Sequence, residues 1–362
     1  MGVEFKLSDR ELPASPAFIT FLADILMGGR AGPEIWSDQT SEALLRWETG
    51  EPQRVAKAAD FVMQSPRGRE LVAKAYSVLV SLLTGDPQPL TALHSRFQFI
   101  NVAGIPRTGG SYLTAELYRS IGMAPERVPS ALAHDSFPEA GPFELTEGVN
   151  SWIVTLKTTA EYLVMVETFF ADRAARSDGI VVPKKLTKGL YAAAFFQRVF
   201  GPHSSYLLTV RHPVAACIST YEKSGGLPED RRPAVRSNIE EWCRRDLQHT
   251  GCGAEQFRTM DYFDAYLRYW EQYHMLVTTT GLSGAPNLRI IGYGSEALHS
   301  VAQQCHHLHG SNLRALPFRA SCNATQRHPE WVQRARPAIE RVRAAWRVVG
   351  LEFPMEEVIE YL

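Results

Sequence analysis

The sequence predicts an α/β fold, with a central parallel sheet flanked by helices and a helical extension at the N-terminus. Two observations carry this prediction. Short apolar runs alternate with segments of ten or more residues that have helical periodicity, which is typical of a parallel sheet covered on both faces. The first 95 residues contain helical patterns only. We therefore expect a helical subdomain over residues 1–95 and an α/β domain over residues 96–362.

The composition is that of an ordinary globular protein. Of the 362 residues, 45% are hydrophobic and 21% are charged, and the formal net charge is −1. Because there is no overall basic field, neither a nucleic-acid partner nor an anionic membrane is expected. The chain start lacks the pattern of an export signal, and no segment offers about 18 uninterrupted apolar residues. Together with five scattered cysteines, this predicts a soluble protein of the reducing cytoplasm.

The N-terminal subdomain is expected to contain four helices. Ser15-Pro16 starts the first and Ser65-Pro66 precedes the last, since proline suits the first turn of a helix. The proline-rich stretch over residues 85–89 is expected to be a stiff connection into the first strand. These helices carry no recognisable chemistry. Packing or contact in a homodimer is their expected role, and a lid or an acceptor-binding unit is the alternative. The three later helices are expected over residues 41–47, 55–63 and 68–83.

The α/β domain is expected to contain four strands separated by helices. A long helix is expected over residues 157–176, an aromatic helix over 262–277 and a C-terminal helix over 331–349. Ligands of such sheets bind at the carboxyl ends of the strands, so the loops at these ends are the first place to look for a site. The expected strands are residues 97–103, 180–183, 205–210 and 287–293.

A glycine-rich loop follows the first of these strands and precedes a helix. Residues 104–111, GIPRTGGS, match the phosphate-binding pattern G-x-x-x-x-G-K-[ST] except at the lysine, where Gly110 stands. Glycines let the backbone fold around an anion, and the helix that follows points its first N–H groups at that anion. Arg107 can supply the missing cation as a planar fork suited to phosphate or sulfate. The loop therefore predicts a P-loop-like anion site and makes ordinary ATP chemistry doubtful.

A second anion motif follows the third strand. Arg211 comes directly after the apolar run of residues 205–210, at a strand end where an anion is expected to bind. Pro213 then suits the first turn of a helix, which carries Ser219.

Together these motifs resemble those of PAPS-dependent sulfotransferases. Residues 106–113, PRTGGSYL, are similar to the family's 5′-phosphosulfate loop, P-[KR]-[ST]-G-[TS]-[TS]-[WY]-L, from which Gly110 departs. Arg211, with a serine eight residues later, resembles the family's 3′-phosphate motif. The resemblance implies a sulfotransferase-like domain that binds 3′-phosphoadenosine 5′-phosphosulfate (PAPS). The residues that it assigns to PAPS are Arg107, Thr108, Gly109, Gly110, Ser111, Tyr112, Arg211 and Ser219.

The resemblance also implies the reaction. A sulfuryl group passes from PAPS to a hydroxyl or amine of a small-molecule or carbohydrate-like acceptor, without a metal. Arg107 would hold the 5′-phosphate as it becomes the leaving group, and Lys184 or Lys185 after the second strand could assist.

A general base must remove the acceptor's proton. Some members of the family use a histidine after the second strand, but residues 181–199 contain no His, Asp or Glu. Others use a glutamate after the phosphate-loop helix, which directs attention to residues 123–150. His134 is the first candidate because the unperturbed pKa of a histidine side chain lies near neutrality and Asp135 could orient the ring. Glu139 is the next.

Two other functions stay open from the sequence. A P-loop phosphotransferase using ATP would need a lysine where Gly110 stands and a carboxylate for magnesium, and no apolar strand ends in such a residue. A catalytically silent nucleotide-binding or scaffold protein would fit the missing hydroxyl at position 110 and the unassigned base. Cys305 and His309 share one helix face, but two ligands do not make a zinc site, so no metal is predicted.

Overall fold

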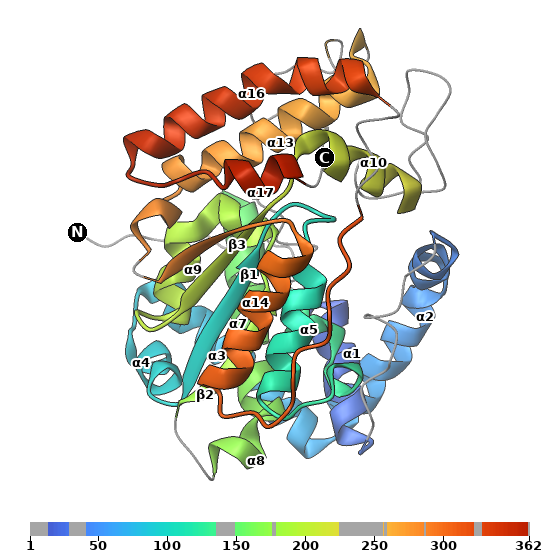
Figure 1. The fold of residues 1–362 in the computed structure, drawn as a ribbon. Helices are drawn as coiled ribbons and strands as arrows, with labels where there is room; N and C mark the ends of the chain where they lie inside the picture. The colour runs from blue at the N-terminus through green and yellow to red at the C-terminus, as the bar shows by residue number, and fades with distance from the viewer. Residues whose placement is uncertain are drawn as a thin grey trace, which may run out of the picture.

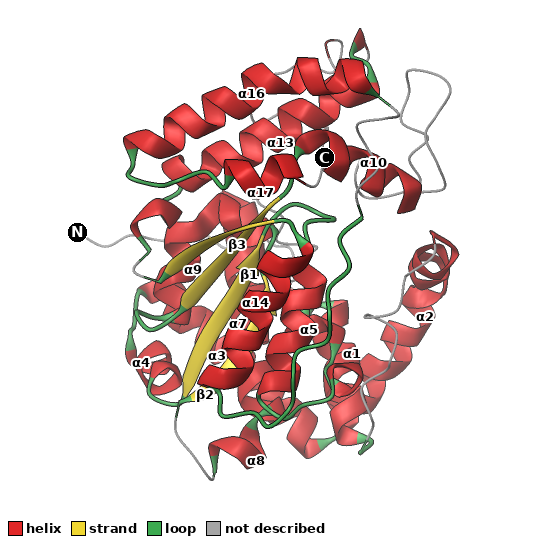
Figure 2. Cartoon of the chain, in the orientation of Figure 1, coloured by secondary structure: helices red, strands yellow, loops and turns green. Residues whose placement is uncertain are grey.

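A computed structural model shows a parallel sheet with helices on both faces, which confirms the predicted α/β fold (Figure 1, Figure 2). In the described part of the chain, no helix combines the length and the apolar character needed to cross a bilayer. The structure describes residues 14–28, 41–134, 149–175, 179–223, 256, 259–285, 287–321 and 328–360.

The described sheet has four parallel strands in the order β2-β1-β3-β4. They are β1 (Phe97–Ala103), β2 (Ile180–Lys185), β3 (Ser205–Val210) and β4 (Leu288–Gly292). All four lie where the sequence predicts them, and β2 runs two residues further, through Lys185. Because β1 lies between β2 and β3, the loop that follows β1 emerges between the carboxyl ends of both neighbours.

Helices cover the two faces of the sheet through separate groups of apolar side chains. On one face α5 (Gly110–Ser120) and α14 (Ser295–Leu308) pack against strand residues such as Val102. On the other, α7 (Val149–Phe169) and α9 (Ala193–Phe200) pack with Phe99 and its neighbours. Successive side chains of a strand point to opposite faces, so the run of apolar residues in β1 serves both groups.

A further layer of helices lies beyond the carboxyl ends of the strands. α13 (Tyr262–Thr279) and α16 (Pro329–Val348) run along each other at the top of Figure 1. The indole N–H of buried Trp346 in α16 donates to the carbonyl of His274 in α13, at 2.8 Å. The other elements around the sheet are η1 (Pro125–Arg127), α6 (Ser130–Ala133), α8 (Ala171–Ala174), η3 (Lys188–Ala192), α10 (Pro213–Lys223), η4 (Leu282–Gly284) and α17 (Met355–Glu360).

The N-terminal helices correct two expectations. Ser15 caps α1 (Pro16–Leu26) and Ser65 caps α3 (Pro66–Thr84), as predicted. However, α2 (Ser41–Gln64) is one helix where two were expected, because a glycine and a proline weaken a helix without having to end it. The stretch expected as a plain connection opens α4 (Gln88–His94), since proline is accepted in a first helical turn. α1 and α3 share the core of α7, and a separate subdomain over residues 1–95 stays a prediction.

Candidate functional site

The loop between β1 and α5 has an unusual backbone. Gly104, Arg107 and Gly109 have φ angles of 147°, 70° and 88°. A Cβ on Gly104 would lie 2.2 Å from the Thr209 hydroxyl oxygen, and one on Gly109 would lie 2.5 Å from a methyl carbon of Leu298. Both positions therefore require glycine. Arg107 adopts the left-handed region without being glycine, a cost that surrounding contacts must offset.

Two buried threonines hold this loop from inside. The hydroxyl oxygens of Thr108 and Thr209 are 2.7 Å apart, so the loop is tied to β3. The Thr108 hydroxyl oxygen also lies 2.8 Å from the carbonyl oxygen of Ile105, and the Thr209 hydroxyl oxygen lies 3.1 Å from that of Ala103. Because each hydroxyl has a single proton, one of the two donates to its carbonyl and the other donates to the neighbouring hydroxyl. Because the hydroxyl of Thr108 is used within the loop, its backbone N–H is the group that can meet a ligand.

The structure brings the two anion motifs into direct contact. Arg107 in the loop donates from Nε to the hydroxyl of Ser219 at 3.0 Å, and Arg211 donates from Nη1 to the carbonyl of Arg107 at 2.9 Å. The latter bond spans 104 residues of sequence. It also accounts for the strained backbone of Arg107, whose carbonyl is fixed by a charged donor. Two cationic side chains thus lie together at the carboxyl ends of neighbouring strands β1 and β3.

Contacts that were not predicted from the sequence immobilise Arg211, which is only 4% exposed. Its Nη2 donates to the carbonyl and the hydroxyl of Ser321 at 3.0 and 3.1 Å, and its guanidinium carbon lies 4.0 Å from the ring centre of Tyr293. The indole N–H of Trp270 donates to the backbone carbonyl of Arg211 at 2.9 Å. The signal for Trp270 was present in the sequence, because a buried indole N–H must find an acceptor.

The two consecutive lysines at the end of β2 differ in environment. Lys184 is fully buried and donates to the carbonyls of Ala131, Leu132 and His134, at 3.3, 3.5 and 2.7 Å. Lys185 is half-buried, and its ammonium lies 3.3 Å from the hydroxyl of Ser111. The period of the strand places the two side chains on opposite faces of the sheet. Lys185 is therefore the lysine that reaches the glycine-rich loop.

His134, the first candidate for the base, lies beside Lys185. Its Nε2 is 3.2 Å from the Lys185 ammonium nitrogen. Since an ammonium only donates, Nε2 accepts this bond and is the unprotonated nitrogen of the ring. His134 is thus held by its carbonyl through Lys184 and by its ring through Lys185. The other two candidates, Asp135 and Glu139, lie outside the described residues.

The remaining loop residues open α5. Gly109 is the N-cap, and Ser111 is exposed in the first turn. The ring of Tyr112 packs on that of Phe318, with 4.8 Å between the ring centres, and the Tyr112 hydroxyl donates to the carbonyl of Leu316 at 2.6 Å. A Cβ on Gly110 would lie 3.5 Å from the Lys185 side chain, an ordinary contact. A side chain at position 110 would therefore cause no steric clash at its Cβ.

Two buried histidines near this site are neutral. Burial, and next the charge of Arg211, lowers the pKa of His212 to about 3. Burial lowers the pKa of His274 to about 4, although the hydrogen bond to the Trp270 carbonyl opposes it. His212 adjoins Arg211 in sequence, but its ring nitrogen Nδ1 accepts from the N–H of Val214 at 3.3 Å. Such depressed pKa values make both residues poor proton acceptors at neutral pH.

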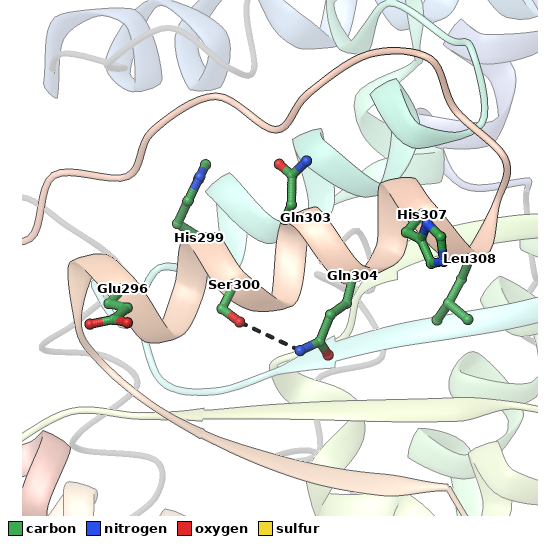
Figure 3. Close-up of a pocket in the computed structure, with 7 residues that line it drawn as sticks. All are labelled: Glu296, His299, Ser300, Gln303, Gln304, His307 and Leu308. Atoms are coloured by element: carbon green, nitrogen blue, oxygen red, sulfur yellow. Dashed lines mark hydrogen bonds between the residues drawn. The ribbon is translucent and has the colours of Figure 1, made fainter.

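A shallow groove of about 680 Å³ follows α14 (Figure 3). Its described lining comes from this one helix and contains no predicted site residue. Among the described residues, which include Cys305 and His309, no group of three or more His, Cys, Asp or Glu side chains is suited to hold a metal ion. His309 instead lies 2.7 Å from the hydroxyl of Ser120. The lining residues are Glu296, His299, Ser300, Gln303, Gln304, His307 and Leu308.

No protein-family model matches this chain, and none of the curated proteins compared with it is similar in sequence. The site must therefore be interpreted from its own geometry.

Proposed function

We propose that this protein is a cytoplasmic, PAPS-dependent sulfotransferase with a P-loop-like nucleotide site. The observation that carries the proposal is the contact between the two anion motifs, in which Arg107 meets Ser219 and Arg211 meets the carbonyl of Arg107. PAPS carries anionic groups on both its 5′ and 3′ sides. A site that joins two arginines from adjacent strand ends suits such a ligand better than a nucleotide with phosphates on the 5′ side alone.

The two halves of the nucleotide would bind in different places. The 5′-phosphosulfate would lie over the loop that carries Arg107, where the Lys185 ammonium approaches Ser111 in the first turn of α5. The 3′-phosphate would bind beside Ser219 and Arg211. Residues of the loop that are exposed or half-buried, such as Arg107 and Ser111, are accessible to a ligand.

The proposed reaction is a direct transfer. An oxygen or nitrogen of the acceptor forms a bond to sulfur, while the bond from sulfur to the bridging oxygen of the 5′-phosphate breaks and its electron pair stays on the product PAP (adenosine 3′,5′-bisphosphate). Arg107 and Lys185 would stabilise the negative charge that develops on this oxygen. His134 would accept the acceptor's proton at Nε2 once the Lys185 ammonium has moved from this nitrogen to the leaving oxygen. The acceptor is proposed to be a small molecule or a carbohydrate.

Calorimetric binding of PAP tests the proposal. We expect wild type to bind PAP well and ATP poorly, and Arg107→Ala and Ser219→Ala to weaken PAP binding roughly 10-fold to 100-fold, the range for a lost charge-assisted hydrogen bond. Arg211→Ala should do the same, but its side chain is buried, so its fold must be checked by circular dichroism. Arg67→Ala, which removes an exposed arginine of α3, is the matched control and should leave PAP binding unchanged. Absence of PAP binding by wild type would refute the proposal.

Turnover separates an enzyme from a silent binder. Wild type incubated with PAPS should release PAP, with water as the slow acceptor when no better one is present. Binding of PAP without any release of PAP from PAPS, over a panel of hydroxyl and amine acceptors, would instead support a silent nucleotide-binding or scaffold protein. Tight ATP binding would favour the phosphotransferase.

A further inference from the structure

One side chain of α13 bridges the ends of β1 and β2. The hydroxyl of Tyr273 accepts from the N–H of Gly104 at 3.1 Å and donates to the carbonyl of Thr187 at 3.0 Å. Gly104 is the first residue of the glycine-rich loop, and Thr187 lies two residues after Lys185. A single oxygen atom therefore fixes the start of the loop relative to the segment that carries the lysine.

Another side chain of the same helix holds the end of β3. Trp270 lies one helical turn before Tyr273 and donates from its indole N–H to the carbonyl of Arg211. Both side chains are fully buried. They lie in the layer formed by α13 and α16, which packs beyond the strand ends (Figure 1). One rigid helix thus supports the carboxyl ends of three neighbouring strands.

The chemistry of these contacts suits positioning better than core packing alone. Phenylalanine would supply a similar apolar surface in place of Tyr273 and a smaller one in place of Trp270, yet each native residue places a polar atom on a backbone group of the site. Removing either polar atom leaves a buried N–H or carbonyl without its bond, which loosens that strand end.

We propose that Trp270 and Tyr273 are positioning residues that hold the two phosphate subsites at a fixed separation. Tyr273 acts on the 5′ side through Gly104, and Trp270 acts on the 3′ side through Arg211. The assignment of the two sides rests on the proposed function, whereas the mechanical link from α13 to the strand ends does not.

Binding of three nucleotides to Tyr273→Phe and Trp270→Phe tests whether Tyr273 acts on the 5′ subsite and Trp270 on the 3′ subsite. The ligands are PAP, 5′-AMP, which lacks the 3′-phosphate, and 3′-AMP, which lacks the 5′-phosphate. Tyr273→Phe should weaken PAP and 5′-AMP about fivefold, the factor equivalent to ~1 kcal/mol, and leave 3′-AMP unchanged. Trp270→Phe should weaken PAP and 3′-AMP and spare 5′-AMP. Equal weakening of all three ligands in both variants would mean general loosening and would overturn the proposal.

Amide hydrogen exchange gives a second test that needs no ligand. In Tyr273→Phe, the amides of residues 104–109 and 186–190 should exchange about fivefold faster than in wild type, and those of α14 should not change. Tyr118→Phe is the control, because it also removes a buried hydroxyl that donates to a carbonyl, that of Pro183 at 2.7 Å, without touching the loop. If wild type binds none of the nucleotides, the proposed function fails. Hydrogen exchange still tests whether Tyr273 links α13 to the ends of β1 and β2. Unchanged exchange at both segments would refute the link itself.

Discussion

The carboxyl ends of β3 and β2 lie on either side of the glycine-rich loop and are built in opposite ways. At the end of β3, Arg211 is buried and immobilised by Ser321, Tyr293 and the carbonyl of Arg107. At the end of β2, Lys185 is half-buried and reaches a serine and a histidine through a flexible stem. The difference suits the two proposed tasks. A side chain that anchors a bound phosphate benefits from a fixed geometry, and a side chain that stabilises charge as it develops on the leaving oxygen benefits from conformational freedom.

The largest expected effects come from substituting the two lysines at the end of β2, one of which should change the rate and the other the stability. Lys185→Met should lower the rate of PAP release from PAPS roughly 100-fold to 1,000-fold, because it removes the charge that is proposed to stabilise the leaving oxygen. The free energy of unfolding should change by less than about 1 kcal/mol, as is usual away from the core. The rate is measured by the appearance of PAP, and stability by urea denaturation.

Lys184→Met is the matched control and should show the reverse. It leaves one buried and two part-buried carbonyls without their charged donor, so the free energy of unfolding should fall by ~3 kcal/mol. Lys184→Met should lower the rate less than Lys185→Met does, because it acts only by shifting His134, whose carbonyl Lys184 holds. An inactive Lys184→Met protein with wild-type stability would show that the roles of the lysines are exchanged.

Substitution of two glycines is expected to give a smaller contrast. Gly104→Ala should lower the free energy of unfolding by ~2 kcal/mol, because its φ is positive and its Cβ would overlap the Thr209 hydroxyl. Gly110→Ser should be tolerated to within about 1 kcal/mol, since its Cβ meets the Lys185 side chain at an ordinary distance. Urea denaturation measures both. A strongly destabilised Gly110→Ser protein would contradict the geometry described for this turn.

The smallest expected effect is the part of the pH dependence that comes from two buried histidines on the β3 side, His212 and His274. The folded-state pKa values of His212 and His274, about 3 and about 4, lie below the unfolded value of 6.5. The unfolded chain therefore binds more protons in this window, so stability is complete above pH 6.5 and falls as the pH drops towards 4. From pH 7 to pH 6 these two histidines together should decrease the free energy of unfolding by about 1.4 kcal/mol.

Single substitutions sharpen this prediction. His274→Gln should remove about half of the contribution of these two histidines, and His307→Gln, which removes an exposed histidine of α14, is the control. Equal slopes in all three proteins would contradict the buried, neutral state of His274.

The strands and the two anion motifs were predictable because each rests on a local pattern, an apolar run followed by glycines or by an arginine. The extra residues of β2 were not, since Lys184 and Lys185 do not look like strand residues, and only the pairing with β1 shows that they alternate across the sheet. Trp270 and Tyr273 lie in the aromatic helix that the sequence predicts over residues 262–277, and both are fully buried. Their polar atoms reach strand ends that are more than 50 residues away in sequence, which no local pattern reveals.

A crystal structure with PAP bound tests the central claim most directly. We predict that the 5′-phosphate lies on the amides that open α5, within hydrogen-bond distance of Arg107, and that the 3′-phosphate contacts Ser219 and Arg211. A nucleotide bound elsewhere, for example in the groove along α14, or one that leaves Arg211 untouched, would contradict the account.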